Sequence, residues 1–137
     1  MNATFIIAVH ILLYLDKHEG YINSEELAKN ICVKSSRVRA VCKSLKKAEL
    51  IEVCNKKNGG YKLNKKLDEI TALMCMEAVE DRSVKIHWVS GDEYMDCPIS
   101  SSMNGIMGDL ERELNGVCNM YLEGISIRDF SNKIFNI

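Results

Sequence analysis

Apolar residues recur at helical spacing along most of the chain and alternate only in one short stretch. The run from Phe5 to Leu15 is apolar on nearly every side, which predicts a buried helix that meets more than one neighbour. The tetrad from Asn23 to Glu26 reads Asn-Ser-Glu-Glu and fits a capping box. It predicts a short helix over residues 25–30.

A break around residues 32–34 separates this short helix from the next one. Ser35 or Ser36 is expected to cap the second helix, which runs to about Ala48. Within it, four apolar residues at steps of three and four form a core stripe: Val38, Val41, Cys42 and Leu45. The remaining outer face is polar and basic. Two short helices around a tight turn, the second with such a face, predict a helix-turn-helix.

A hairpin is predicted directly after these helices. Residues 50–54 and 61–63 are strand candidates, and the turn between them contains Asn58-Gly59 and Gly59-Gly60 steps. Such steps supply the positive φ values that a tight hairpin turn needs. Lysines at its tip suit contact with phosphate. A hairpin in this position predicts a winged helix.

The C-terminal half contains one long helical pattern. Its apolar stripe recurs at steps of three and four and comprises Met103, Ile106, Leu110, Leu114, Val117 and Tyr121. The other side carries Asp109, Glu111, Arg112 and Glu113. Two interpretations stay open from the residues alone, because the stripe either packs on its own domain or forms the seam of a dimer.

Charged residues are distributed unevenly along the chain, although the formal net charge is only −1. Residues 1–66 hold 13 Lys and Arg against 6 Asp and Glu, whereas residues 67–137 hold 5 against 13. A cationic half is typical of nucleic-acid binding, because Lys and Arg displace counterions condensed on phosphate. A merely solvated charged face is the simpler alternative. The length of 137 residues favours one domain with an appended element.

Cysteine and histidine spacings exclude several classes of protein. The six cysteines contain no Cys-x-x-Cys pair, and the first apolar run has neither a preceding basic residue nor a cleavage site. That run is also too short to span a bilayer. We therefore expect a reducing, cytoplasmic location and no membrane association. The three histidines lie far apart and no catalytic or phosphate-binding motif appears, so an enzyme is not expected.

Three passages together resemble a family of bacterial regulators. They are residues 36–51, the Gly59-Gly-Tyr-Lys-Leu63 segment, and residues 69–80 with Cys97-Pro98. This pattern is similar to the IscR/NsrR/CymR family, the Rrf-two family of transcription regulators. The resemblance implies a dimeric winged-helix protein that binds palindromic double-stranded operator DNA. It also implies that the long C-terminal helix serves dimerisation.

The chain departs from this family pattern in two places. Family members often carry an Arg-Gly at the tip of the wing, and Asn55-Lys56 stands here instead, which would weaken base discrimination by the wing. Iron–sulfur members resemble one another in three cysteines within about fifteen residues, whereas residues 91–109 contain only Cys97. Clusters are held mainly by thiolates, so we expect neither a cluster nor another metal or cofactor.

The predicted fold is mainly α with a small β-wing. Residues 1–66 form a winged helix-turn-helix DNA-binding domain, and residues 67–137 form a sensor loop and dimerisation region. The predicted major-groove residues are Ser35, Ser36, Arg37, Arg39 and Lys43. At the wing, Lys56, Lys57 and Asn58 are expected to contact the DNA backbone or the minor groove.

Two cysteines have suggestive positions for redox sensing. Cys32 lies in the turn that aims the second helix, and Cys97 lies in a polar loop just before the long helix. In a dimer, Cys97 of one chain meeting Cys32 of the other would let oxidants alter DNA binding, a mechanism that the family resemblance permits. The function expected is a homodimeric regulator, a repressor rather than an activator. A protein-interaction module and a regulator that responds to a small ligand remain alternatives.

Overall fold

Helix α1 (Ala3–Lys17) runs through the middle of the globular part of the molecule. The computed structural model describes residues 1–135. Around α1 lie the helices α2 (Ser24–Ile31) and α3 (Ser35–Lys47), and the antiparallel strands β1 (Ile51–Cys54) and β2 (Gly60–Leu63). A short 3-10 turn, η1 (Leu67–Glu69), and helices α4 (Ala72–Ala78) and α6 (Ile127–Phe135) complete this globular part.

The core forms on α1 because apolar side chains cover nearly its whole circumference. Ile7, Ala8, Ile11 and Leu12 are at most 4% exposed. They share one core with the stripe of α3, whose four residues Val38, Val41, Cys42 and Leu45 are all buried as predicted. Full burial of each Ile, Leu or Val among them contributes roughly 1.5–3 kcal/mol, so the packing on α1 fixes where α2 and α3 lie.

The helix caps differ in part from the expected pattern. Asn23 Oδ1 accepts from the Glu26 amide at 2.8 Å, but the Glu26 carboxylate accepts from the Tyr14 hydroxyl instead of turning back to cap α2. The prediction that Ser35 or Ser36 caps α3 is wrong. Lys34 is the N-cap residue and makes no side-chain cap. Ser35 lies inside the helix, where its hydroxyl accepts from Arg39 one turn on.

The hairpin turn has the predicted positive φ at Asn58 and Gly60 but not at Gly59. Asn58 has a φ of 64°, in the left-handed region, and the strands pair from Ile51–Leu63 to Cys54–Gly60. Gly60 has a φ of 152°, and a Cβ there would lie 2.3 Å from the Ile22 carbonyl oxygen. That close approach lets Tyr61 exchange two backbone hydrogen bonds with Ile22, so the wing is attached to the chain just before α2.

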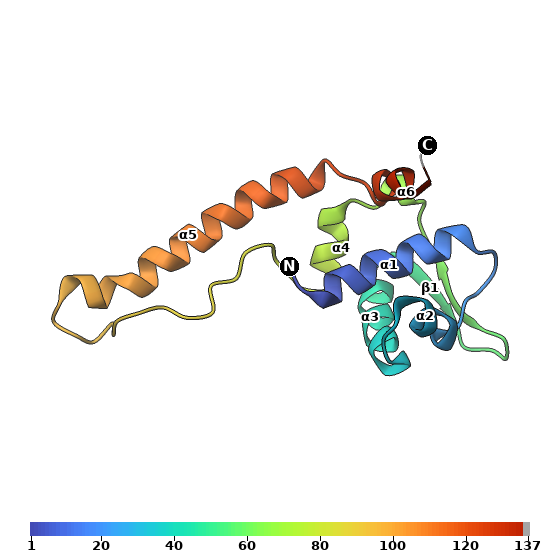
Figure 1. The fold of residues 1–137 in the computed structure, drawn as a ribbon, viewed down its shortest axis with the longest axis horizontal. Coiled ribbons are helices and arrows are strands. Elements are labelled where there is room, and N and C mark those ends of the chain that lie inside the picture. The colour runs from blue at the N-terminus through green and yellow to red at the C-terminus, as the bar shows by residue number, and fades with distance from the viewer. Residues whose placement is uncertain (136–137) are drawn as a thin grey trace.

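Residues 82–97 and helix α5 (Pro98–Glu123) form an arm that leaves the globular part (Figure 1). The extended segment before α5 is fastened along the helix by side chains. Asn115 bonds both backbone groups of Val84, and the Glu111 carboxylate accepts from the Ile86 amide. At the root of the arm, the fully buried Asp81 carboxylate pairs with Lys85 and accepts from the Asn2 amide. The far end of the arm projects away from the globular part (Figure 1).

The predicted fold class is confirmed, since the chain is mainly helical with a small two-stranded wing. The division at residue 66 stays a prediction, and residues 136–137 of its second part lie outside the described residues. Leu67, Ile70, Cys75 and Ile127 share one core with α1–α3, so the acidic half contributes to the packing of the basic half. Within residues 1–135, no helix is both long and apolar enough to cross a membrane.

The glycine at the base of the wing gives a test of this arrangement. Gly60→Ala should destabilise the protein by more than Gly20→Ala, although both replace a glycine with positive φ. Gly20 has no neighbour within 4 Å of a Cβ, so only the backbone strain of about 1–2 kcal/mol applies there, whereas Gly60 adds the clash with Ile22. Urea unfolding of both variants measures the difference, and equal losses would contradict the close approach.

Candidate nucleic-acid interface and cysteine sites

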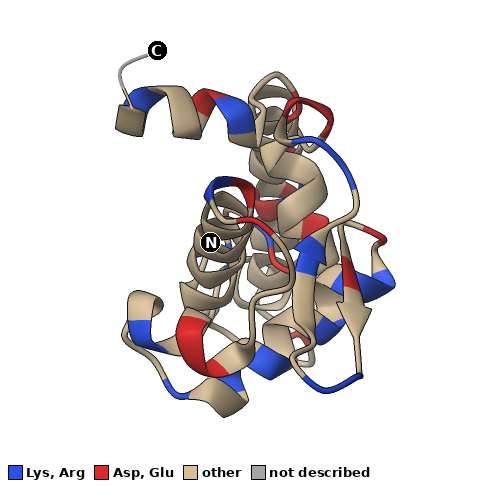
Figure 2. Ribbon diagram, turned by 90° about the vertical axis from the view of Figure 1, so that its right-hand side faces the viewer, with Lys and Arg blue, Asp and Glu red and all other residues tan. Residues whose placement is uncertain are grey.

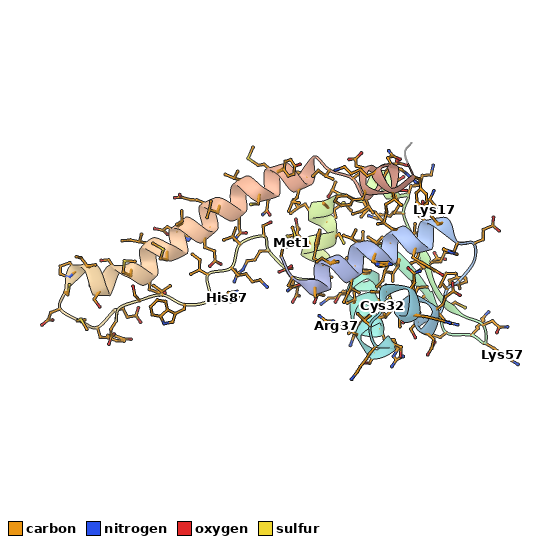
Figure 3. The ribbon with its side chains drawn as sticks, viewed as in Figure 1. Met1, Lys17, Cys32, Arg37, Lys57 and His87 are labelled. Carbon is orange, nitrogen blue, oxygen red and sulfur yellow. The ribbon has the colours of Figure 1, made fainter. Side chains whose placement is uncertain are left out.

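The outer face of α3 and the tip of the hairpin form the basic surface of the molecule. Figure 2 shows Lys and Arg along this part of the ribbon and at the hairpin tip. Arg37 and Lys57 both lie at the lower edge of the globular part in Figure 3, far from His87 on the arm. The side chains that sequence predicts for DNA contact are exposed except for the half-buried Ser35. The fold thus brings the predicted helix and wing residues to one side.

The two predicted arginines of α3 differ in their surroundings. Arg39 Nη1 donates to Ser35 Oγ at 3.2 Å and to Ser24 Oγ at 3.4 Å, and it lies 3.9 Å from the Glu25 carboxylate. Its guanidinium therefore ties α3 to the start of α2. Arg37 makes no side-chain hydrogen bond or ion pair within residues 1–135, and its fork of donors faces solvent. Such a free guanidinium suits bidentate contact with guanine.

Side chains of α1 hold α2 in place from the other side. The Tyr14 hydroxyl donates to the Glu26 carboxylate at 2.7 Å, and His10 Nε2 lies 2.7 Å from Asn30 Oδ1. The hydrogen bond to Glu26 raises the pKa of Tyr14. Sequence reasoning missed both bonds because the partners are 12 and 20 residues apart, and no local pattern marks such a pair. Of these side-chain contacts, only the one between Ser35 and Arg39 has a local signal in the sequence, because the two residues lie four positions apart on one helix.

Cys32 ends α2 in a left-handed conformation. Its φ is 67°, unusual for a residue with a side chain, and its thiol is exposed. The thiol lies 3.8 Å from the Lys29 carbonyl oxygen, within donor distance for sulfur. Cys32 thus occupies the turn between α2 and α3, as the sequence predicts, and it faces solvent in the globular part of the molecule.

Cys97 is the N-cap residue of α5 and lies at the outer end of the arm. Its thiol is exposed, and the backbone N–H groups of Ser100 and Ile99 lower its pKa. The sequence left this direction open, because three nearby carboxylates oppose the helix terminus. The backbone N–H groups at the start of α5 decide the direction, since they favour the thiolate over the thiol. Within one chain the fold does not bring Cys97 to Cys32, which lies on the globular part beyond the root of the arm (Figure 1).

The buried cysteines behave differently from Cys97. Desolvation raises the pKa of Cys42 and of Cys75 to about 12, so both remain thiols at neutral pH. Residues 1–135 contain no group of three or more Cys, His, Asp or Glu side chains placed to hold a metal ion. The arm contains two cysteines, Cys97 at the start of α5 and Cys118 in its second half, and residues 91–109 contain only Cys97.

Comparison with known proteins identifies the family model that fits this chain. The model of the Rrf2 family, described as iron-dependent transcriptional regulators, matches residues 1–133. No match was found among curated proteins.

Solved structures share the fold at low sequence identity. A candidate transcriptional regulator from Lactobacillus plantarum aligns with a TM-score of 0.87 at 23% identity, covering 98% of this chain and 91% of that one. The IscR protein of T. potens gives 0.70 at 15% identity over 98% and 87% of the two chains. The oxidised form of Staphylococcus aureus CymR gives 0.67 at 15% over 95% and 94%.

The thiol environments predict an order of chemical reactivity. At pH 7.5, iodoacetamide should modify Cys97 well before Cys42 and Cys75, because the lowered pKa gives Cys97 more thiolate and exposure gives it access. Mass spectrometry of timed samples measures the order, and the same reaction in urea should remove the protection of the two buried thiols. Modification of Cys42 as fast as Cys97 in the folded protein would contradict this assignment.

Proposed function

Because the chain belongs to the Rrf2 family of transcriptional regulators, we propose that it is a homodimeric repressor of palindromic operator DNA that responds to oxidants through its cysteines. The observation that carries the proposal is the exposed basic face of α3 beside the lysines of the wing. A transcription regulator of this kind acts in the cytoplasm and needs no catalytic site. Residues 1–66 supply the DNA-binding part, and residues 67–137 supply sensing and dimerisation.

We assign reading of the operator mainly to the N-terminal half of α3. Arg37 enters the major groove and pairs with a base, assisted by Ser35, Ser36 and Lys43. Arg39 contacts DNA from a position that Ser24 and Glu25 of α2 fix, so it also sets the angle of α3. A bidentate arginine–guanine pair contributes about 1–3 kcal/mol of discrimination. At the wing, Lys56, Lys57 and Asn58 contact phosphates or the minor groove and add affinity that depends little on sequence.

The exposed apolar face of α5 supports the proposed dimer. Ile106, Leu110, Leu114, Val117 and Tyr121 all lie on one side of the helix and are exposed in the single chain. Monomeric proteins rarely leave so continuous an apolar strip in water. A two-fold dimer built on this helix presents two copies of α3, which then address half-sites about one helical turn apart.

We propose that sensing needs no iron–sulfur cluster, although the family is described as iron-dependent. The cysteine content of the segment supports this proposal, because residues 91–109 contain a single cysteine, Cys97. Oxidation of cysteine is the chemistry that remains available at the arm. A peroxide oxidises the Cys97 thiolate to a sulfenic acid and is itself reduced to water. The Cys32 thiolate of the partner subunit then attacks that sulfur, forming the disulfide and releasing a second water.

Charges around the two thiols favour their approach across a dimer. The loop before Cys97 carries Asp92, Glu93 and Asp96, whereas Lys29, Lys34 and Arg37 surround Cys32 in the sequence. Opposite charges on the two segments attract each other at short range. Like charges disfavour contact between two Cys97 loops or between two Cys32 turns. A disulfide between them would fix the arm to the turn before α3 and so change the spacing of the two reading helices.

DNA binding tests the main proposal. With an operator selected from random DNA, Arg37→Ala should weaken binding about 5- to 150-fold, while binding to unselected DNA changes little. Lys57→Ala should weaken both alike and reduce the slope of log affinity against log salt by about one. Arg112→Ala removes the same charge from α5 and serves as the control. Equal losses on both DNAs for Arg37→Ala would contradict base reading, and no salt-dependent binding would favour a protein-interaction module.

Non-reducing gels test the redox proposal separately. Mild hydrogen peroxide should give a covalent dimer and release operator in the wild type and in Cys118→Ser, but not in Cys32→Ser or Cys97→Ser. A mixture of the last two variants should form the covalent dimer again, since each mixed dimer retains one Cys97 opposite one Cys32. Release of operator by peroxide from both single variants would show that the signal enters elsewhere.

A further inference from the structure

The chain contains three Asn-Gly pairs, and they lie in different structural surroundings. Asn58-Gly59 lies at the tip of the hairpin, whereas Asn104-Gly105 and Asn115-Gly116 lie inside α5. An asparagine followed by glycine is chemically labile, because the unhindered backbone nitrogen of the glycine can attack the side-chain amide. The rate of this attack in a folded protein depends on how firmly the backbone around the pair is held.

Helical structure protects the two pairs of α5. In an α-helix each amide donates to the carbonyl oxygen four residues earlier, and each side chain points back toward the N-terminus, away from the next nitrogen. The Asn115 side chain is also held, since its Nδ2 donates to the Val84 carbonyl oxygen and its Oδ1 accepts from the Val84 amide, both at 2.9 Å. Attack on either asparagine of α5 therefore requires part of a 26-residue helix to open.

The tip of the hairpin is held much less firmly. Asn58 is exposed, and the Gly59 amide makes a single turn bond, to the Lys56 carbonyl oxygen at 2.8 Å. Neither residue of the pair belongs to β1 or β2, and Lys57 beside it projects from the end of the hairpin in Figure 3. Opening of one turn bond at such an exposed place costs little free energy. The Gly59 nitrogen is therefore the most readily freed of the three.

The shape of the turn accepts few other residues at these two positions. A Cβ on Gly59 would collide with the carbonyl oxygens of Cys54 and Lys56, so no side chain fits there. Asn58 has a φ of 64°, which asparagine adopts more readily than most residues with a side chain. The backbone conformation that closes the wing thus also favours a labile pair.

We propose that Asn58 is a site of spontaneous deamidation and that the product weakens the contact of the wing with DNA. The Gly59 nitrogen loses its proton to hydroxide and attacks Asn58 Cγ, which closes a succinimide ring, and the side-chain nitrogen leaves as ammonia. Water then opens the ring at either of its two carbonyls and leaves aspartate or isoaspartate. The net reaction consumes water, releases ammonium and replaces a neutral amide by a carboxylate.

The effect on DNA rests on the proposed function, in which Lys56 and Lys57 contact phosphates. A carboxylate at residue 58 lies beside these two exposed ammonium groups and repels phosphate, which has the same sign of charge. Isoaspartate also lengthens the main chain by one carbon atom, which disturbs the pairing of Cys54 with Gly60. Each copy of the protein therefore loses wing affinity with age, while α3 is unchanged.

Peptide mass spectrometry measures the chemistry without DNA. During incubation at pH 8 and 37 °C, the tryptic peptide of residues 58–62 should acquire the deamidated mass about tenfold faster than the peptides that contain Asn104 and Asn115. In urea the three rates should become similar, because the helix no longer protects its two pairs. A stable Asn58, or equal rates at the three sites in the folded protein, would overturn the proposal.

Substitutions at the tip test the consequence for DNA binding. Asn58→Asp carries the charge of the product and should weaken binding to operator and random DNA alike, about three- to tenfold, and lower the salt slope by about one. Asn58→Gly keeps the positive φ and cannot deamidate, so its affinity should survive an incubation in which the wild type weakens. Asn104→Asp places the same charge on the arm and should bind DNA like the wild type.

The outcomes separate this site from the proposed function. If Asn58→Asp binds both DNAs like the wild type while Lys57→Ala weakens both, the proposed effect is overturned and DNA contact by the wing stands. If neither variant changes binding, the wing contact of the proposed function fails, and the effect of deamidation fails with it. Loss of affinity during incubation at the wild-type rate in Asn58→Gly would assign the ageing to another residue and overturn the proposal.

Discussion

Burial of α1 is the constraint on which the rest of the structure depends. This helix is apolar around almost its whole circumference, and water contact on any side of it is unfavourable. It therefore gathers α2, α3, the wing, α4 and α6 around itself, although these elements come from both halves of the chain. The position of the basic helix relative to the wing follows from packing against this one element, whereas the arm meets the globular part chiefly at α4.

Polar contacts then fix the angles between the helices that packing brings together. Tyr14 and His10 bond α1 to α2, and Arg39 bonds α3 to α2, so the helix-turn-helix is held on both sides by hydrogen bonds to side chains. Arg128 of α6 plays the same part elsewhere, pairing with Asp16 of α1 and Asp68 of η1. In the proposed dimer the two copies of α3 would have to match half-site spacing, so these fixed angles would matter more for operator binding than their modest energies suggest.

Within one chain the arm places the proposed redox thiol of Cys97 far from the basic face of α3. Cys97 has a lowered pKa at the start of α5, and the basic face of α3 lies on the globular part at the other end of the molecule. The apolar face of α5 has no partner among the described residues. In the proposed dimer the arm of one subunit would reach the partner, which would connect cysteine oxidation with DNA binding.

The sequence by itself determined the elements with a local cause. The periodicity of Val38 to Leu45 predicted α3, the Asn-Gly and Gly-Gly steps predicted the wing, and the stripe from Ile106 to Tyr121 predicted α5, because each depends on neighbours a few residues away. The separation of charge along the chain likewise predicted a basic face. Tertiary structure alone decided that Arg39 turns back to Ser24, that Glu26 bonds Tyr14 instead of capping its own helix, and that α1 and α6 enclose a groove. Those contacts join residues far apart in the chain, and their geometry depends on how the helices pack, which no local pattern encodes.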